Sequence, residues 1–93
     1  MARPPGDRSR FAPADERLMA QVAAKLGPMG LRIERFTQPG IDGYRILPFG
    51  SDDPAWLVVR HFDGMYQLES GTLRTLRTGT ALRAVLLPGW LPE

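Results

Sequence analysis

Cysteine is absent from the 93-residue chain, which excludes a disulfide scaffold, a cysteine-ligated zinc module and a thiol nucleophile. Long apolar runs are missing as well: the longest span five residues, as in Ala55–Val59, whereas a membrane-spanning helix needs about 20. The first ten residues carry basic side chains but no apolar segment, so we expect no secretory signal. Together these absences predict a cytoplasmic protein.

Lysine and histidine are scarce. Eleven of the 12 basic residues are arginine, Lys25 is the one lysine, and His61 is the one histidine. Together with 10 glycines and 9 prolines, this bias is typical of a GC-rich coding sequence, and we expect a protein of a bacterium or a bacterial mobile element. The net charge of +2 is uneven: residues 1–10 (three Arg, one Asp) and 70–93 (three Arg, one Glu) each carry +2, and residues 11–69 (six basic, eight acidic) carry −2.

The length predicts a single domain, because domains usually contain about 100–150 residues and this chain falls slightly short. An apolar content of 43% is too high for a disordered chain and sufficient for one modest core. Residues 1–10 contain two prolines, one glycine and no large apolar side chain after Met1. They are predicted to form a flexible basic arm, and residues 11–93 a single α+β domain.

The clearest predicted element is a helix from Pro13 to about Leu26. Proline suits the first helical position, and Asp15 and Lys25 match the helix dipole at its positive and negative ends. Gly27-Pro28 is a strong termination signal. Apolar residues recur every four positions and form one stripe: Ala14, Leu18, Val22 and Leu26. The opposite face is expected to need no partner: Glu16, Arg17, Gln21 and Ala24.

Three or four strands are predicted after this helix: Leu31–Phe36, Tyr44–Phe49, Ala55–Phe62 and Met65–Glu69. The segment 72–78 fits either a short helix or a strand. A final helix is expected from Ala81 to Leu87, capped by Thr80 and ended by Pro88-Gly89. The predicted fold is therefore α+β: an N-terminal helix packed on a three- to four-stranded, mainly antiparallel sheet, followed by a short C-terminal helix.

The dipeptide Asp63-Gly64 predicts a hairpin between the last two of these strands, because it favours a two-residue type I′ turn. Such a turn places Phe62 opposite Met65 and His61 opposite Tyr66, and directly opposed residues share a face of the sheet. The expected faces are then Trp56, Val58, Arg60, Phe62, Met65 and Gln67 on one side, and Leu57, Val59, His61, Tyr66 and Leu68 on the other.

Catalysis would have to use His61, and the sequence surrounds it with no recognised nucleophile. The predicted hairpin instead places it beside Tyr66, so we interpret it as a structural histidine of the sheet. Three aspartates, Asp42, Asp52 and Asp53, lie where turns favour them and lack the spacing of a metal site. We therefore expect no catalytic residue, no metal site and no cofactor, and a small enzyme based on His61 is the least favoured alternative.

A protein-binding surface is the leading functional hypothesis. Aromatic, methionine and arginine side chains are enriched in interfaces, and the predicted hairpin gathers such residues on one face: Trp56, Arg60, Phe62 and Met65. Trp90-Leu91 is a second exposed candidate. If the helices cover this face, these side chains belong to the core instead. The hypothesis is a non-enzymatic module that occludes another protein or complex stoichiometrically, for example a phage or mobile-element accessory protein that inhibits a host defence complex.

A nucleic-acid-binding regulator is the alternative hypothesis. The basic arm and the C-terminal segment, the latter through Arg74, Arg77 and Arg83, offer contacts to phosphates. The small net charge of +2 and the single lysine argue against this function. Protein binding is therefore placed first and nucleic-acid binding second.

Overall fold

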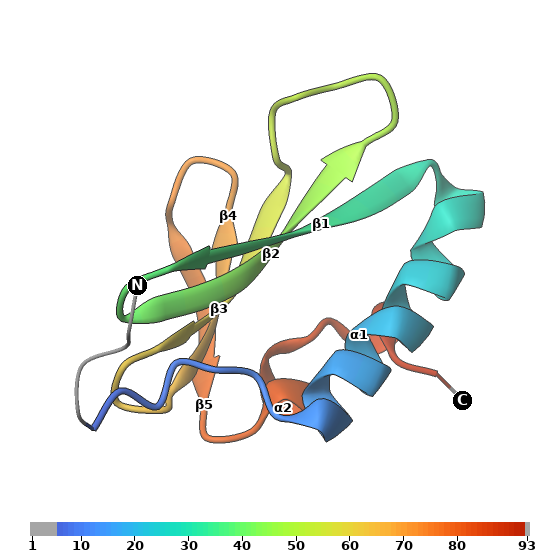
Figure 1. Ribbon diagram of the computed structural model, residues 1–93. Helices are drawn as coiled ribbons and strands as arrows, with labels where there is room; N and C mark the ends of the chain where they lie inside the picture. Colours follow the sequence, from blue (N-terminus) through green and yellow to red (C-terminus); the bar gives the residue numbers. More distant parts are fainter. Residues whose placement is uncertain (1–5, 93) are drawn as a thin grey trace.

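A computed structural model of the protein describes residues 6–92 and contains one antiparallel sheet with both helices on the same face (Figure 1). The strands follow one another in the order β1-β2-β3-β4-β5. Their bounds are β1 Leu31–Gln38, β2 Ile41–Pro48, β3 Trp56–His61, β4 Tyr66–Ser70 and β5 Thr75–Gly79. The helices are α1 (Pro13–Leu26) and α2 (Leu82–Val85), with 3₁₀ turns at Gly27–Met29 and Pro88–Trp90. The predicted α+β fold is confirmed, with five strands rather than three or four because segment 72–78 contributes β5.

Helix α1 has the predicted bounds, and its N-terminus is closed by Asp15, whose carboxylate accepts a hydrogen bond from the Ala12 backbone N–H at 3.3 Å. Of the predicted stripe, Val22 and Leu26 are buried against the sheet, whereas Ala14 is exposed and Leu18 half-buried. Met19, beside the stripe, is 1% exposed and completes the buried face. Capping, dipole and burial therefore favour the same residues, which is why the helix could be predicted from its own segment.

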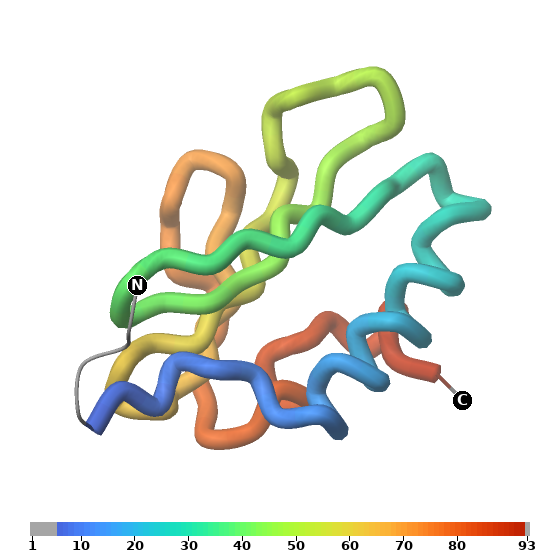
Figure 2. Tube along the Cα trace, viewed as in Figure 1, coloured from blue at the N-terminus to red at the C-terminus, as the bar shows by residue number. Residues whose placement is uncertain are grey.

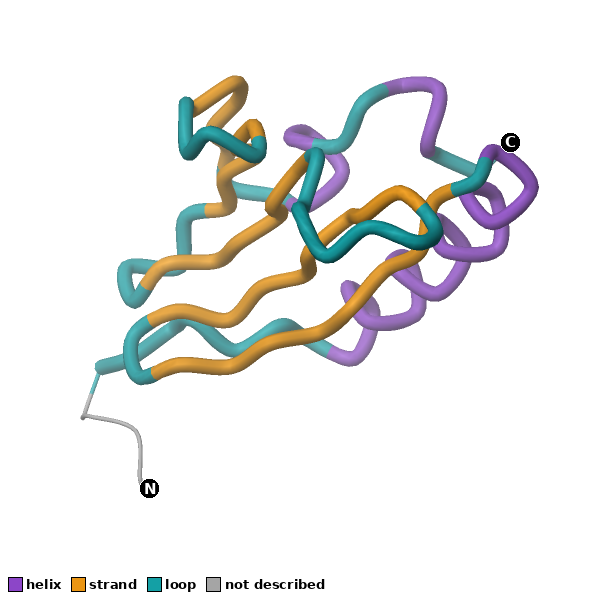
Figure 3. The backbone as a smooth tube through the Cα atoms, turned by 90° about the horizontal axis from the view of Figure 1, so that it is seen from above, coloured by secondary structure: helices purple, strands orange, loops and turns teal. Residues whose placement is uncertain are grey.

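One core lies between the helices and the face of the sheet that they cover, which we call the front face (Figure 3). The helical side contributes Met19, Val22, Leu26, Leu82, Val85, Leu86 and Trp90, and the sheet contributes Tyr44, Ile46, Val58, Tyr66 and Leu68. Figure 3 shows no helix over the other side of the sheet in the part of the chain that is described. We call that uncovered side the back face.

Helix α2 is shorter than predicted and spans Leu82–Val85 instead of residues 81–87. Ala81 rather than Thr80 is its N-cap residue, and no side chain caps it. Leu86 already has an extended ψ of 144°, and so has Leu87 at 140°, directly before Pro88. A proline disfavours helical backbone in the residue that precedes it, which accounts for the extended Leu87 but not for Leu86.

The C-terminal residues close the core. Trp90 is 4% exposed and meets Trp56 edge to face, with ring centroids 5.1 Å apart. The Lys25 ammonium donates a hydrogen bond to the Leu91 carbonyl at 2.8 Å and so ties this segment to α1. The prediction that Trp90-Leu91 is an exposed binding element is therefore wrong, because the indole finds its apolar partner in a distant strand.

The β3–β4 hairpin differs from the prediction by one residue. Its loop contains three residues, 62–64: the His61 N–H donates to the Met65 carbonyl at 2.9 Å, and the Gly64 N–H donates to the His61 carbonyl at 2.8 Å. Gly64 has a φ of +88°, whereas Asp63 does not have a positive φ, as a type I′ turn would require. The loop is therefore a type I turn followed by a left-handed glycine, a second geometry that Asp-Gly also suits.

The longer loop shifts the register of β4, so that Arg60 lies opposite Tyr66 instead of Gln67. A slip of one residue exchanges the two faces of a strand. Tyr66 therefore enters the core with 4% exposure, and Met65 lies on the back face. The predicted face that combined Trp56 with Met65 is wrong for this reason.

The back face is closed by side chains of the sheet itself. Phe36 lies across Gly43, where an added Cβ would sit 2.4 Å from the ring and 2.9 Å from Val59. The Arg45 guanidinium stacks on Phe36 at 4.4 Å from its centroid. Val59 is only 1% exposed. The absence of a side chain at Gly43 thus lets an aromatic ring cover the strand without a helix.

Part of the N-terminal segment lies against the domain. Of the predicted flexible arm, residues 1–5 fall outside the described residues, whereas residues 6–10 run beside the β3–β4 hairpin (Figure 2). The Arg8 N–H donates to the Phe62 carbonyl at 2.8 Å, and Ser9 is fully buried. Phe11 follows directly and enters the core. Residues 6–10 therefore pack on the hairpin instead of extending from it, because Phe11 anchors the chain beside them.

Replacement of Gly64 by valine should lower the free energy of unfolding by about 1 kcal/mol or more, because a β-branched residue is strongly disfavoured at positive φ. Gly27→Ala is the matched control: Gly27 has a helical φ of −52°, and nothing lies within 4 Å of an added Cβ. That substitution should be neutral or slightly stabilising. Urea or thermal unfolding measures both variants, and an unchanged midpoint for Gly64→Val would contradict the loop geometry.

Candidate functional site

The residues predicted to bind a partner do not share one surface. Trp56 lies on the front face and is half-buried against Trp90. Phe62 is 65% exposed in the loop at the other end of β3, and Met65 is half-buried on the back face. Of this set, Phe62 alone presents a largely exposed aromatic side chain.

Arg60, the fourth member of that set, is engaged within the fold. Its guanidinium lies over the Tyr66 ring at 4.7 Å from the centroid. Its Nε donates to the Gly64 carbonyl at 3.0 Å, and its Nη1 donates to the Arg10 carbonyl at 2.8 Å. These contacts join β3, the hairpin loop and the N-terminal segment, so substitution of Arg60 would disturb the structure before it disturbed any partner.

His61 lies on the back face and not beside Tyr66 as predicted, because of the shifted register. Its Nε2 is 3.1 Å from Oε1 of Gln67. The Gln67 amide in turn donates to Glu69 at 2.9 Å and to the Thr75 hydroxyl at 2.7 Å. An amide rather than a hydroxyl or a carboxylate therefore contacts the imidazole, and this arrangement does not activate a nucleophile.

Asp42 is fully buried within β2, not in a turn as predicted; the turn lies at residues 39–40. The Arg35 guanidinium donates to its carboxylate at 3.3 Å and also pairs with Glu16 of α1. The hydrogen bond to Glu16 raises the pKa of Arg35 above its usual value. These ion pairs join α1, β1 and β2, and residues 6–92 contain no group of three side chains that could hold a metal ion.

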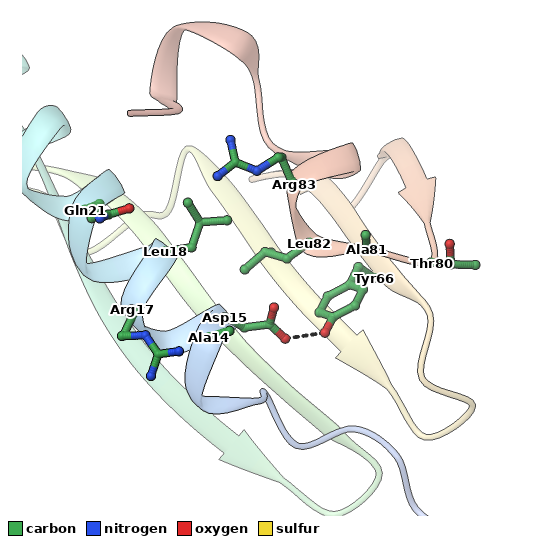
Figure 4. Close-up of a pocket in the computed structure, with 10 residues that line it drawn as sticks. All are labelled: Ala14, Asp15, Arg17, Leu18, Gln21, Tyr66, Thr80, Ala81, Leu82 and Arg83. Atoms are coloured by element: carbon green, nitrogen blue, oxygen red, sulfur yellow. Dashed lines mark hydrogen bonds between the residues drawn. The ribbon is translucent and has the colours of Figure 1, made fainter. Parts of the chain in front are cut away.

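A groove of about 500 Å³ lies between α1 and the α2 region (Figure 4). Leu18 and Leu82 lie in its middle, Arg17 and Gln21 line it from α1, and Arg83 lines it from α2. The polar face of α1, predicted to need no partner, thus forms one wall of the groove. Arg17 and Arg83 form no ion pair with the described carboxylates, so the groove has two exposed cations at its rim.

At the end of this groove, the Tyr66 hydroxyl donates a hydrogen bond to the Asp15 carboxylate (Figure 4). Burial, together with this hydrogen bond and the charge of Asp15, raises the pKa of Tyr66 to about 12. Burial also raises the pKa of Tyr44, which lies on the same face. Tyr66 therefore stays protonated near neutral pH and acts as a donor that fastens the start of α1 to β4.

Three loops line one end of the sheet, which we call the loop end: 27–30, 49–55 and 71–74, with 49–55 between the other two (Figure 1). The Phe49 N–H donates to the Gly30 carbonyl and the Gly71 N–H to the Ala55 carbonyl, each at 2.9 Å. Three large apolar side chains are exposed there: Met29 (61%), Phe49 (59%) and Leu73 (68%). The loop end is thus held by backbone hydrogen bonds and presents apolar side chains to solvent.

Leu73 has the only positive φ of a non-glycine residue in the described chain, +65°. Its loop repeats the geometry of the β3–β4 loop: the Leu73 N–H donates to the Ser70 carbonyl at 2.8 Å, as the Gly64 N–H does to the His61 carbonyl. The left-handed conformation costs an L-residue about 1–2 kcal/mol. The sequence offered no signal for it, because leucine is not a turn residue.

The arginines of the nucleic-acid alternative follow one another along and beyond β5. Arg74 directly precedes β5, Arg77 lies within it, and Arg83 lies in α2. The Arg77 Nη1 donates to the Leu86 carbonyl at 3.0 Å. None of the three forms an ion pair within residues 6–92. Arg74 thus directly follows the exposed Leu73, whereas Arg77 lies further along β5 and is bonded to the C-terminal region.

Comparison of the chain with protein-family models, with curated proteins and with solved structures finds no match. Within residues 6–92, no helix has both the length and the apolar character needed to cross a membrane.

The Tyr66–Asp15 contact predicts how stability depends on pH at alkaline values. Tyrosine in the unfolded chain ionises near pH 10, whereas Tyr66 in the folded protein has a pKa of about 12. The unfolded state therefore loses its proton first, so the contribution of Tyr66 is complete below pH 10 and is lost as the pH rises towards 12. Asp15→Asn should lower the pKa of Tyr66, measured by phenolate absorbance in a Tyr44→Phe background. An unchanged pKa would contradict the contact.

Proposed function

We propose that the protein is a non-enzymatic protein-binding module that occludes its partner stoichiometrically, and that the loop end is its main contact surface. The observation that carries this proposal is Leu73, which is left-handed and 68% exposed. His61, the natural candidate for a catalytic base, contacts only an amide in the described structure, which supports a function without catalysis.

Leu73 is unfavourable for the fold in two respects. Its backbone conformation favours glycine, and its side chain leaves most of its surface in water. Folding alone would favour glycine here, as at Gly64 in the corresponding loop. Burial of a leucine side chain in an interface gains about 1.5–3 kcal/mol, which is enough to offset a backbone cost of about 1–2 kcal/mol. A partner that buries Leu73 therefore explains why leucine stands at this position.

Two other exposed side chains of the loop end support the same interpretation. Phe49 and Met29 are of residue types enriched in interfaces, and both are more than half exposed. The backbone hydrogen bonds between the loops hold these residues in place before a partner arrives. Such preorganisation lowers the entropy that binding must overcome.

The biological setting belongs to the same proposal. We propose a bacterial, cytoplasmic protein of a phage or mobile element, which inhibits a host complex by covering one of its surfaces. Composition supports this part: 11 arginines against a single lysine are expected from a GC-rich coding sequence.

Leu73→Gly separates binding from folding. The variant should be more stable by about 1 kcal/mol, because glycine adopts positive φ without strain. Capture of the partner from a nuclease-treated lysate of the cells that encode the protein should fall about fivefold or more, because an apolar contact is lost. A melting curve and a quantitative pull-down measure both effects, and a loss of binding in a more stable variant cannot be attributed to unfolding.

Phe62→Ala is the matched control, because Phe62 is 65% exposed in the equivalent loop at the other end of β3. This variant should melt and bind as the parent does. Full capture by Leu73→Gly would overturn the assignment of the loop end. Loss of capture by Phe62→Ala alone would place the contact at the hairpin that the sequence analysis favoured.

Nucleic-acid binding is the second candidate, favoured by the absence of ion pairs at Arg74, Arg77 and Arg83 within residues 6–92. In that case a triple substitution of these arginines by glutamine should abolish binding of an oligonucleotide. The affinity of the parent should fall steeply with salt, with a log–log slope of up to about three. Leu73→Gly should leave the affinity unchanged, so the two functions give opposite results with the same variants.

A further inference from the structure

The two edges of the sheet differ in how their arginines are compensated. On β1, Arg32 pairs with Glu34, and Arg35 pairs with Glu16 and Asp42. Beside β5, Arg74 and Arg77 form no ion pair with the described carboxylates. Residues 70–92 contain three arginines and no acidic residue. The β1 edge thus has its carboxylates in place, whereas the β5 edge carries uncompensated positive charge.

The β5 edge is also open to contact. Within residues 6–92 no strand lies beyond β5, and residues 75–78 are exposed along their whole length. The register with β4 shifts between Leu68 and Glu69, and Leu76 of β5 is 46% exposed. The hydrogen bond from Arg77 to the Leu86 carbonyl keeps that guanidinium beside the strand. The segment from Leu73 to Arg77 thus carries two exposed leucines and two uncompensated arginines.

We propose that β5 binds an extended acidic segment of the partner protein, which adds to the sheet as a further strand. The free backbone groups of β5 would hydrogen-bond to this segment, and Arg74 and Arg77 would pair with its carboxylates. Leu73 and Leu76 would contact apolar side chains of the same segment. This inference rests on the proposed protein-binding function and specifies the chemistry of the partner.

The charge of β5 also disfavours two other occupants. In an antiparallel pair formed with a second copy of the chain, Arg77 at the centre of β5 would face its own counterpart, and like charges directly opposed are destabilising. A nucleic acid would neutralise the arginines, but it has no peptide groups to extend the sheet and leaves the exposed leucines without an apolar partner. Charge and hydrogen bonding together therefore favour an acidic polypeptide.

Fluorescence anisotropy with short labelled peptides tests this proposal. The probe is a peptide of alternating glutamate and valine, which supplies both carboxylates and apolar side chains and favours an extended conformation. The controls are the same peptide N-methylated at alternate residues, a lysine–valine peptide, and a single-stranded oligonucleotide of matching charge. We expect the acidic peptide to bind and both control peptides to fail, and we expect amide hydrogen exchange to slow at residues 75–79 but not in β1.

Substitutions in the protein provide a second test. The double variant Arg74→Gln, Arg77→Gln should weaken binding of the acidic peptide by about three- to tenfold, the combined effect of two exposed ion pairs. Arg17→Gln is the matched control, since Arg17 is also exposed and without an ion pair among the described residues, but lies on α1. If loss of the bond to Leu86 alters the melting curve, Arg74→Gln alone serves, because no side-chain hydrogen bond of Arg74 would be lost.

Several outcomes would overturn strand addition. Equal binding of the N-methylated peptide would leave only charge attraction, and tighter binding of the oligonucleotide would assign the edge to nucleic acid. A concentration-dependent dimer in sedimentation, lost on substitution of Leu76, would assign it to a second copy. If the acidic peptide fails to bind but the Leu73→Gly variant still fails to capture the partner, the proposed strand addition is wrong and the proposed function stands. If Leu73→Gly also binds normally, the proposed function fails as well.

Discussion

A single 14-residue helix must cover most of a five-stranded sheet, and this shortage of helical surface determines what the structure leaves exposed. Helix α1 and the short C-terminal region bury one face, where Val58 and Leu68 have no exposed surface. Burial of apolar surface is the main favourable contribution to folding, so the front face takes the largest share of it. The back face, the edges and the loop end must then be stabilised by other contacts or stay open to solvent.

Charged and polar groups take over where the apolar layer ends. Asp42 is fully buried, and a charge in that position is tolerated only with partners such as the Arg35 guanidinium. The Tyr66 hydroxyl fastens the start of α1 through Asp15, and Arg60 joins the β3–β4 hairpin to the N-terminal segment. In the described structure these residues hold separate segments together.

The remaining exposed features are those that folding alone does not account for. Two hairpin loops of the same geometry carry glycine in one case and leucine in the other at the left-handed position. Both edges of the sheet carry arginines. Those on β1 pair with carboxylates, whereas those beside and within β5 have no carboxylate partner among the described residues. The loop with leucine and the edge without carboxylate partners both belong to the β4–β5 hairpin. That coincidence gives a common explanation to Leu73 and to the arginines beside it.

The sequence by itself determined those features that depend on residues close together in the chain. The bounds of α1 follow from its proline, its cap and its four-residue periodicity, and the α+β class follows from the strand patterns after it. Asp63-Gly64 located a hairpin but not its register, because the dipeptide suits loops of two lengths and the burial of Tyr66 selects one. Likewise, only pairing with β4 made residues 75–79 a strand, and only contact with Trp56 buried Trp90. Helix and turn preferences are carried by residues that are close in sequence, so they can be predicted from one segment. Strand register, side-chain exposure and backbone strain depend on contacts between segments far apart in the chain. These contacts decided where the candidate surface lies.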